Sequence, residues 1–411
     1  MVIDETILSL MKKYDKSFYI YEEKEIIRSI NKLKENFTSF EFLYSVKTNP
    51  NKNIINTIRE NKIGGDAASV NEVKLCVKAK MKKEDIIYSA PGKTKRDIEE
   101  IYDKCIITAD SYHELELLNQ IAKKRDIKLK IGIRINANYN VYNNKPLSSK
   151  YGIDEEDLML NKEYIESFEN LEIIGIHVHL QSQILDYKII YNYYKYILDL
   201  AILCKDKMNF NLEFINFGGG IGISYNEFQN DLNIELLGKM SDKLINEYRD
   251  RLNCRFIIES GRFIACKSGT YVTPIVDIKT SRNIKYLIVL NAYNGFFKPT
   301  ISEMVVSYAT SKENLKMYEP LFTSFDSYKV RLLRQNKKES MEREQVTIGG
   351  NLCTAVDIIA KDIELPHAEI NDLIVINNAG SYAYTLTPIL FSSQEKPLEI
   401  YLSKDNKLNI T

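Results

Sequence analysis

Lysine, acidic and histidine residues stand where short apolar runs of this chain end, and each of these residue types can do chemistry. Lys47 closes the run in EFLYSVKTNP (41–50). A lysine there either lies over apolar surface with its ammonium in water or is held for a reaction. Glu259 follows another apolar run, so burying its carboxylate is costly without a cationic partner. Which role Lys47 has depends on what the rest of the chain brings to the same place.

A glycine-rich segment and an arginine supply a candidate phosphate site. GGGIG (218–222) lets backbone N–H groups point together toward a phosphate, although a tight loop after a strand is the alternative. Arg262 presents a fixed fork of donors to phosphate oxygens, or else forms a surface ion pair. With Lys47, Glu259 and His179, these groups indicate pyridoxal phosphate, bound through the lysine and tuned at its ring nitrogen by the carboxylate. A hydrogen-bonded structural role is the alternative for His179.

The elements that must position these residues follow a repeating pattern from residue 40 to residue 261. Short β-branched or aromatic runs alternate with longer segments of helical period. Eight such units predict a (β/α)8 barrel, which places chemistry at the C-terminal ends of its strands. A doubly wound open sheet is the alternative, but it usually has fewer strands. The predicted strands begin near residues 41, 63, 85, 105, 129, 171, 212 and 254.

Charged, polar or glycine residues stand at most of the predicted strand ends. Strands built only for a core would not need them. They are Lys47, Asp66, Arg134, Asn136, His177, His179, Ser182, Gly218, Gly219, Gly220, Glu259, Gly261 and Arg262.

The pattern changes after residue 266, where strand-like runs follow one another without long helical segments. This predicts a second, all-β domain. We expect the barrel to cover residues 25–265, and a β-sandwich or β-barrel domain to cover 266–411, joined by the N-terminal residues 1–24 as a strand.

The composition of the 411 residues excludes several classes of function. Lys+Arg and Asp+Glu are balanced at 56 each, so no basic face for nucleic acid is expected. The apolar stretches are strand-sized and no signal core is present, so we expect a cytoplasmic protein with no membrane span. Six scattered cysteines are expected to be reduced thiols, and four histidines leave little material for a metal site.

Motifs in order along nearly the whole chain resemble the fold-type III pyridoxal-phosphate-dependent decarboxylases, which include diaminopimelate and ornithine decarboxylases. The motifs are YSVKTN, GGDAASVNE, HVHLQSQ, NFGGGIGI, ESGR, GNLCTAVD and AGSYAY. The resemblance implies covalent attachment at Lys47, ring stacking by His179 and a phosphate contact from Ser182. It implies a cofactor-binding set of Lys47, Asp66, Arg134, His179, Ser182, Gly219, Gly220, Glu259, Gly261, Arg262 and Tyr382.

The resemblance also implies a homodimer with shared active sites. Cys353 would then act on the neighbouring subunit's cofactor and donate the proton that replaces CO2, which makes Lys47, Cys353, His179 and Glu259 the catalytic set. Taken alone, Cys353 would more often be a small buried hydrophobe than a catalytic thiol. Lys150 and Asp357 resemble the family's intersubunit ion pair.

The departures from the family pattern concern the substrate. Where diaminopimelate decarboxylases usually have an arginine and a glutamate, this chain has Lys298, in KPTIS with Ser302, and Thr354 beside the cysteine. A neutral threonine does not compensate a cationic side-chain end, so simple diamino acids are expected to fit poorly. The pattern is more similar to siderophore-pathway decarboxylases that act on citryl-diaminopropionate, and it predicts a larger amino-acid conjugate as substrate.

Several alternatives stay open at this point. A meso-diaminopimelate decarboxylase of lysine biosynthesis is the first, and an amino-acid racemase of the same fold is the second, although a racemase would need a tyrosine where Cys353 stands. A non-catalytic regulator would have lost the lysine or the phosphate residues. A barrel enzyme acting on a phosphorylated sugar would not bind pyridoxal phosphate.

Overall fold

The computed structural model describes residues 2–140, 146, 148–225, 230–301, 328–334 and 342–411. The chain divides into two compact units. We call the first the barrel unit (Ile27–Ile223 and Asp231–Phe263) and the second the β unit (Met1–Ile26, Ser224–Asn230 and Ile264–Thr411).

Eight parallel strands among the described residues close the barrel unit. β10 pairs with β2 and β5 pairs with β6, so the sheet returns on itself and the open-sheet alternative is wrong. All eight predicted barrel strands are confirmed. They are β2 (Glu41–Ser45), β3 (Gly64–Ala67), β4 (Ile86–Tyr88), β5 (Ile106–Ala109), β6 (Leu129–Asn136), β8 (Leu171–His177), β9 (Phe214–Asn216) and β10 (Arg255–Glu259).

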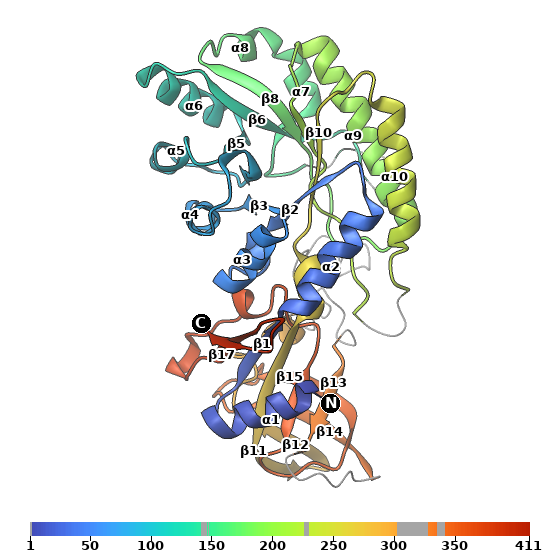
Figure 1. Cartoon of the computed structure of the whole chain (residues 1–411). Helices are drawn as coiled ribbons and strands as arrows, with labels where there is room; N and C mark the ends of the chain where they lie inside the picture. Colours follow the sequence, from blue (N-terminus) through green and yellow to red (C-terminus); the bar gives the residue numbers. More distant parts are fainter. Residues whose placement is uncertain (1, 141–145, 147, 226–229, 302–327, 335–341) are drawn as a thin grey trace. The chain divides into compact units, whose positions relative to one another are not determined.

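Helices connect the barrel strands. Figure 1 shows α3 to α6 on one side of the strands and α9 and α10 on the other. A short strand, β7 (Ile153–Asp154), extends the sheet beside β6. The helices are α2 (Glu23–Asn36), α3 (Lys52–Glu60), α4 (Val70–Lys78), α5 (Lys95–Ile101), α6 (Tyr112–Lys124), α7 (Glu155–Leu160), α8 (Lys162–Glu166), α9 (Tyr187–Met208), α10 (Ile234–Tyr248) and α11 (Arg262–Ala265).

The register of the parallel strands brings polar residues of different strands side by side. Ser45 on β2 pairs with Asp66 on β3. His177 on β8 pairs with Arg134 on β6 and with Asn216 on β9. Because parallel strands end at the same rim, residues far apart in the sequence meet there.

An aromatic ring fills the barrel interior below this rim. Phe214 belongs to a buried cluster with Leu43, Ile87, Ile106, Ile174 and Ile257. A Cβ atom on Gly175 would lie 2.3 Å from the Phe214 ring. Gly175 therefore leaves the space that the ring needs, as expected for a close-packed interior.

Two strand-to-helix turns use the same cap. Ser69 accepts a hydrogen bond from the backbone N–H of Glu72, and Ser111 accepts one from Glu114. The two glutamates reach back to the backbone N–H groups of Ala68 and Asp110. In each turn Ser-x-x-Glu thus satisfies donors that the start of a helix leaves free.

A buried ion pair links the loop after β4 to α6. The Lys93 and Glu114 side chains are 0% and 2% exposed, and their charged atoms lie 2.8 Å apart. The Lys93 ammonium also donates to the backbone carbonyls of Ala90 and Thr108. Each charge is thus paired and hydrogen-bonded, which a buried charge requires.

The β unit contains one mixed sheet. β1 is parallel to β17 and β12 is parallel to β14, whereas the other pairs are antiparallel. Its strands are β1 (Phe18–Glu22), β11 (Gly269–Ser281), β12 (Ile284–Val289), β13 (Val330–Leu333), β14 (Arg343–Gly350), β15 (Ile358–Pro366), β16 (Leu373–Ile376), β17 (Leu398–Leu402) and β18 (Leu408–Ile410).

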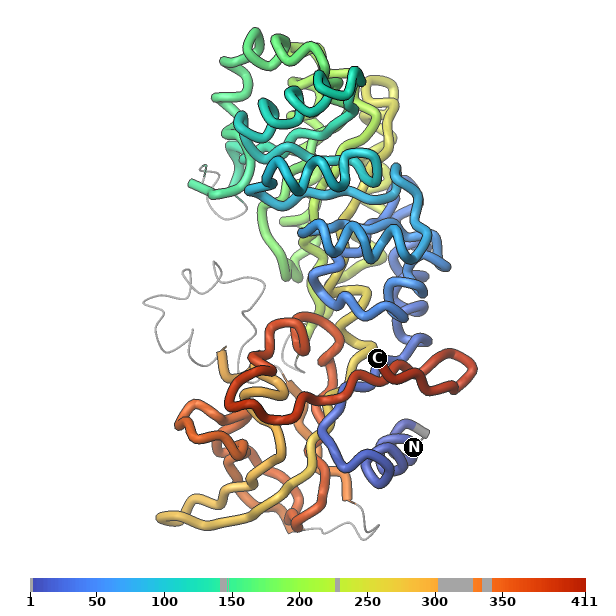
Figure 2. Tube along the Cα trace, turned by 90° about the vertical axis from the view of Figure 1, so that its left-hand side faces the viewer, coloured from blue at the N-terminus to red at the C-terminus, as the bar shows by residue number. Residues whose placement is uncertain are grey.

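The N-terminal region is only partly a strand. Residues 18–22 form β1 and join the β unit, but α1 (Val2–Tyr14) is a helix, so the expectation that 1–24 is a strand is wrong for residues 2–14. Ile7, Leu10 and Met11 of α1 pack against the strands of the same unit, because their spacing places them on one face. Figure 2 shows this blue helix and the red C-terminal segment, both of the β unit.

We expect Lys93→Met to lower the free energy of unfolding by about 3–5 kcal/mol, because Glu114 is then left buried and unpaired. Urea denaturation followed by circular dichroism measures the change. Lys93→Met/Glu114→Gln should recover part of the loss, since glutamine removes the stranded charge and keeps one of the two oxygens that accept from backbone N–H groups. Equal loss in the single and double variants would contradict this explanation.

Candidate active site

Ten of the predicted site residues lie at the rim of the barrel unit. They are Lys47, Asp66, Arg134, His179, Ser182, Gly219, Gly220, Glu259, Gly261 and Arg262. Four others belong to the β unit, namely Lys298, Cys353, Thr354 and Tyr382. Ser302 lies outside the described residues.

Lys47 is paired with Asp66 at the rim. It lies in a short 3-10 turn (Val46–Thr48) directly after β2, and its ammonium is 3.1 Å from a carboxylate oxygen of Asp66. The lysine side chain is 45% exposed, whereas that of Asp66 is 0% exposed. Burial alone would raise the pKa of Asp66, but the charge and hydrogen bond of Lys47, with the Ser45 and Ser89 hydroxyls, hold it below its ordinary value.

Glu259 is a buried carboxylate with neutral hydrogen-bonding neighbours. The side-chain N–H of Asn216 donates to it over 2.9 Å, and the ring nitrogen Nε2 of His177 lies 3.4 Å away, outside hydrogen-bond geometry. Burial lowers the pKa of His177 well below its ordinary value, so this ring is neutral. Burial, followed by the charge of Asp66, raises the pKa of Glu259 to about 7, against the opposing effects of Lys47, Asn216 and Arg134.

His179 is held as a neutral ring by two contacts. Its Nδ1 accepts a hydrogen bond from the backbone N–H of Gly219 over 2.9 Å, so we assign the proton to Nε2, which lies 3.4 Å from the Ser182 hydroxyl oxygen. Burial, then the charges of Arg134 and Lys47, lowers the pKa of His179 to about 3. The imidazole is therefore uncharged and fixed in orientation.

The glycine segment after β9 forms a cradle that side chains would fill. Gly218 and Gly220 have φ angles of +64° and +135°, which favour glycine. A Cβ on Gly218 would lie 2.6 Å from the Val178 carbonyl oxygen, and one on Gly220 would lie 3.1 Å from that of Gln181. Backbone N–H groups at such a place suit an anion.

Gly261 lets the loop after β10 approach the turn that carries the lysine. A Cβ there would lie 1.9 Å from the Thr48 hydroxyl oxygen, which is buried and has no hydrogen-bond partner among the described residues. Arg262, the first residue of α11, is also buried. The ESGR motif therefore contributes a carboxylate, a close approach and a guanidinium within four residues.

Arg134 connects three neighbours at the rim. Its guanidinium donates to the Ser89 carbonyl over 3.3 Å, lies 3.6 Å from Asp110, and covers the Tyr151 ring at 4.4 Å. Its charge lowers the pKa of both rim histidines. Asn136, two residues further along β6, instead donates to Asp154 on β7 and so connects the two strands.

In the β unit, Cys353 lies on a turn shaped by Asp357. The Cys353 side chain is exposed, so the alternative of a buried small hydrophobe is wrong. The Asp357 carboxylate is buried and accepts hydrogen bonds from the backbone N–H groups of Leu352 and Tyr293. Within one protomer this carboxylate thus shapes the cysteine turn, and its pairing with Lys150 of a second subunit stays a prediction.

Lys298 lies in a cage of tyrosines in the same unit. Its side chain is 0% exposed, and its ammonium donates to the Tyr225 hydroxyl over 3.3 Å. The rings of Tyr225, Tyr328 and Tyr382 lie 4.8, 5.8 and 5.9 Å from the ammonium. Tyr382 itself has a φ of +51°, a strained conformation for a non-glycine residue. A cation is thus held among aromatic faces, which attract positive charge.

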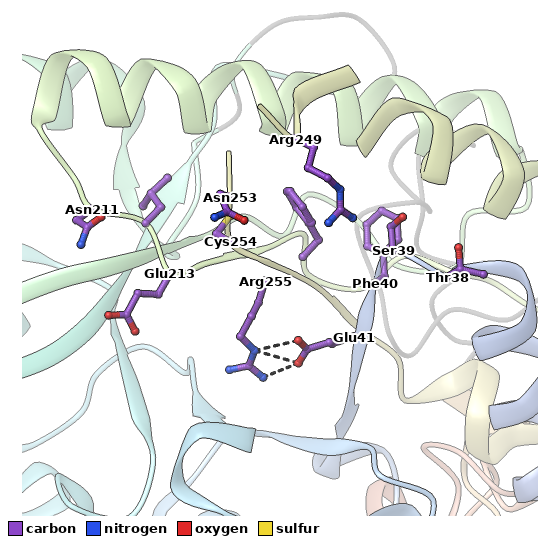
Figure 3. A pocket seen from close by; sticks show the side chains of 12 residues that line it. Thr38, Ser39, Phe40, Glu41, Asn211, Glu213, Arg249, Asn253, Cys254 and Arg255 are labelled. Carbon is purple, nitrogen blue, oxygen red and sulfur yellow. Dashed lines mark hydrogen bonds and ion pairs between the residues drawn. The ribbon is translucent and has the colours of Figure 1, made fainter. Parts of the chain in front are cut away.

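A pocket of about 670 Å³ elsewhere in the barrel unit is not this site (Figure 3). It is lined by the first residues of β2 and β10, so it lies at the opposite ends of these strands. There the Arg255 guanidinium donates three hydrogen bonds of 2.6 to 3.1 Å to the Glu41 carboxylate. This contact joins the two strands that close the barrel, and none of the predicted site residues lines the pocket.

Some site residues were missed from the sequence. Asn216 and Ser89 both contact a rim carboxylate, and both follow apolar residues at the end of a predicted strand. That position was their only signal. A short neutral side chain at a strand end is common, and only the register reveals its partner.

The part of the chain that carries the rim residues matches a known family. The model of the pyridoxal-dependent decarboxylases, pyridoxal binding domain, matches residues 23–266. The L-glutamyl-[BtrI acyl-carrier protein] decarboxylase of Niallia circulans is 28% identical over 405 residues, which cover 96% of this chain and 90% of the relative. The diaminopimelate decarboxylase of Campylobacter jejuni is 27% identical over 406 residues, which cover 96% of this chain and 92% of the relative.

Solved structures share the fold. Diaminopimelate decarboxylase from Helicobacter pylori, complexed with L-lysine, has a TM-score of 0.82 at 24% identity and covers 98% of this chain and 95% of its own. That from M. jannaschii, also with L-lysine, has a TM-score of 0.84 at 23% identity and covers 98% and 91%. None of the helices in the described ranges combines the length and hydrophobicity of a membrane span.

The rim residues fit pyridoxal phosphate, the cofactor of this family. Glu259 is buried beside a neutral amide and a neutral imidazole, so a protonated ring nitrogen would supply the cation that this carboxylate lacks. The Gly218–Gly220 segment brings backbone N–H groups to the end of β9, a kind of place where anions bind. The N–H groups of Gly218 and Gly219 also donate to Asn216 and His179 within the protein. Lys47 is accessible enough to form a covalent bond.

We expect Lys47→Ala to reduce decarboxylation by at least about 10³-fold, because the chain then lacks both the covalent anchor and a proton-transfer group. Carbon dioxide release measures the activity, and mass spectrometry after borohydride reduction locates the pyridoxyl group. Lys52→Ala, at an exposed position of α3, is the control. A pyridoxyl group found on another residue would overturn the assignment of Lys47.

The raised pKa of Glu259 predicts a pH-dependent stability of the cofactor-free protein. The folded state binds this proton up to pH about 7, while the unfolded state releases it near pH 4.5, so the carboxylate reduces stability as pH rises through this interval. Glu259→Gln should stabilise the cofactor-free protein at pH 8 on the order of 1–3 kcal/mol and should have no effect at pH 4.

Urea denaturation of the Glu259→Gln and parent proteins at both pH values measures this difference. Glu169→Gln, which changes an exposed carboxylate, is the matched control. An equal effect of Glu259→Gln at pH 4 and pH 8 would mean that Glu259 is not the group that titrates.

Proposed function

The chain belongs to the pyridoxal-dependent decarboxylase family, and we propose that its substrate is an amino-acid conjugate whose distal end carries no free ammonium group. The enzyme is a carboxy-lyase that uses pyridoxal phosphate. The observation that supports this substrate class is the neutral Thr354 next to Cys353, together with the cationic, buried side chain of Lys298. A conjugate with a carboxylate or amide at its far end suits these residues better than a diamino acid.

A citryl-diaminopropionate-like conjugate of siderophore or secondary-metabolite biosynthesis is the first candidate. Its carboxylates would be complementary in charge to the Lys298 ammonium, which contacts the Tyr225 hydroxyl. This candidate agrees with the resemblance of the segments ESGRFIACKSGTYVTPIVDIK and INFGGGIGISY to that subgroup.

A carrier-bound amino acid is the second candidate. The Niallia circulans relative is named for a glutamyl group on an acyl-carrier protein, and it is 28% identical to this chain. In such a substrate the distal carboxyl is part of the link to the carrier, so a neutral residue at position 354 is compatible with it. meso-Diaminopimelate is the third candidate, supported by the 27% identical Campylobacter jejuni relative.

The residues divide the reaction between them as follows. Bound pyridoxal phosphate supplies an acceptor for the electron pair that the departing carboxylate leaves behind. Lys47 binds the cofactor and exchanges with the substrate amine. Glu259, kept ionised, stabilises a proton on the ring nitrogen. Neutral His179 presents its flat ring without adding charge, and Ser182 and the glycine cradle hold the phosphate with Arg262.

Protonation of the substrate α-carbon completes the reaction. Cys353 is the proposed donor, because its thiol is exposed on a turn that Asp357 holds in place. Lys47 is the other group able to return this proton. We propose that Cys353 acts in the active site of a second subunit, as the family resemblance implies, so that the functional unit is a homodimer.

Mixing two variants tests the shared site. Lys47→Ala and Cys353→Ala subunits, unfolded and refolded together, would form hybrid dimers with one intact site, because each partner supplies the residue that the other lacks. We expect the mixture to recover up to about a quarter of the parent activity, since half of randomly paired dimers carry one good site. A mixture no more active than the sum of the two variants would exclude a site shared in this way.

Replacement of Thr354 tests the substrate class. Thr354→Glu should raise kcat/KM for meso-diaminopimelate and lower it for carboxylate-ended conjugates, each by about 10–100-fold, since a carboxylate attracts a distal ammonium and repels an anion. Thr354→Ser is the matched control.

The measurement is carbon dioxide release by the parent and variant holoenzymes. The substrates are meso-diaminopimelate, L-lysine, L-ornithine, citryl-diaminopropionate and a glutamyl-carrier protein. The proposal requires the parent enzyme to prefer one of the two conjugates. A parent enzyme that prefers diaminopimelate would refute it and establish the third candidate.

A further inference from the structure

One buried amide contacts both ends of the candidate cofactor site. Asn216, the last residue of β9, is fully buried. Its side-chain nitrogen donates to Glu259 over 2.9 Å, and its side-chain oxygen accepts a hydrogen bond from the backbone N–H of Gly218, also over 2.9 Å. The carboxylate and the glycine cradle are therefore joined through a single side chain.

The residue type is demanded by these two contacts. Glu259 offers only acceptors when ionised, and the Gly218 N–H is only a donor, so the side chain between them must donate and accept at once. A neutral amide does both without a charge. An ionised aspartate would accept from Gly218 but repel Glu259, and an alanine would leave both groups unpaired in a buried place.

The backbone on either side of Asn216 is fixed as well. Its carbonyl accepts a hydrogen bond from Val178, which precedes His179. Its register partners are His177 on β8 and Ile257 on β10. The backbone that carries this side chain is therefore held by both neighbouring strands.

The charge of Glu259 depends on every element around it. Asp66 on β3 opposes its ionisation, whereas Lys47 after β2 and Arg134 on β6 favour it. His177 on β8 is neutral. The Asn216 hydrogen bond also favours the ionised carboxylate. Asn216 thus acts on the same protonation equilibrium as the charged residues, but without attracting or repelling the substrate.

We propose that Asn216 is a positioning residue that couples the carboxylate at the ring-nitrogen end of the cofactor site to the phosphate-binding glycine cradle. Its amide favours the ionised form of Glu259 and aligns the carboxylate, and the same amide fixes the backbone of the cradle at Gly218 by accepting its N–H. This inference rests on the proposed roles of Glu259 and the Gly218–Gly220 cradle.

Two substitutions separate the two contacts. Asn216→Ala removes both, and we expect the dissociation constant of pyridoxal phosphate from the cofactor-free protein to rise by about 10–100-fold at every pH. Asn216→Asp keeps the acceptor for Gly218. At low pH its carboxyl is protonated and still donates to Glu259, but at high pH two carboxylates face each other.

Asn216→Asp should therefore resemble the parent protein near pH 6 and lose cofactor affinity as pH rises toward 8.5. The phosphorus NMR signal of bound cofactor should stay close to that of the parent at low pH in Asn216→Asp, and should shift or broaden in Asn216→Ala. Asn119→Asp adds a carboxylate at a part-buried hydrogen bond of α6 in the same barrel unit and should follow the parent throughout.

The experiment measures pyridoxal phosphate affinity by fluorescence quenching, the visible spectrum from pH 6 to 8.5 and the phosphorus spectrum, with circular dichroism to verify folding. Equal impairment of both variants at every pH would reduce Asn216 to a packing residue and overturn the proposal, as would parent-like behaviour of Asn216→Asp at pH 8.5. Mapping of reduced pyridoxyl to Lys47 in the parent is done alongside, so that a wrong cofactor site is recognised separately.

Discussion

A carboxylate buried at the end of β10 is the constraint on which the rest of the rim depends. Glu259 cannot be ionised in that position unless neighbours compensate its charge, because burial and Asp66 both work against it. Lys47 and Arg134 supply positive charge at a distance, and Asn216 supplies the direct hydrogen bond. The result is a carboxyl whose pKa is raised to about 7. A protonated ring nitrogen beside it would shift this carboxyl toward the ionised form.

For the two histidines at the same strand ends, the surroundings favour the uncharged form. Both rim imidazoles are neutral, because they are buried beside Arg134 and Lys47. His179 is also oriented by the glycine segment itself, through the Gly219 N–H. A neutral ring in a fixed orientation adds no charge against the cofactor ring that it is proposed to cover. Electrostatics and backbone geometry are therefore coupled: the cradle that would hold phosphate also orients the imidazole.

Away from the rim, the barrel depends on contacts that only satisfy buried groups. The buried charges of Lys93 and Glu114 compensate each other. The Ser-x-x-Glu caps accept hydrogen bonds from backbone N–H groups at the start of α4 and α6. Arg255 and Glu41 join the first residues of the two strands that close the sheet. These pairs hold the strand ends in register, and the register in turn sets the partners of every rim residue.

The order and type of the barrel strands could be predicted from the sequence, since alternating apolar runs and helical periods are local patterns. Lysine, glycine and glutamate at strand ends were equally visible, and they indicated the cofactor correctly. The N-terminal helix was missed because strand-like residues 17–23 dominated that region. Asn216, the tautomer of His179 and the burial of Lys298 were decided only by tertiary structure, because each depends on a partner tens of residues away. Residue type states what a side chain can donate or accept, whereas barrel closure and register decide which group it meets.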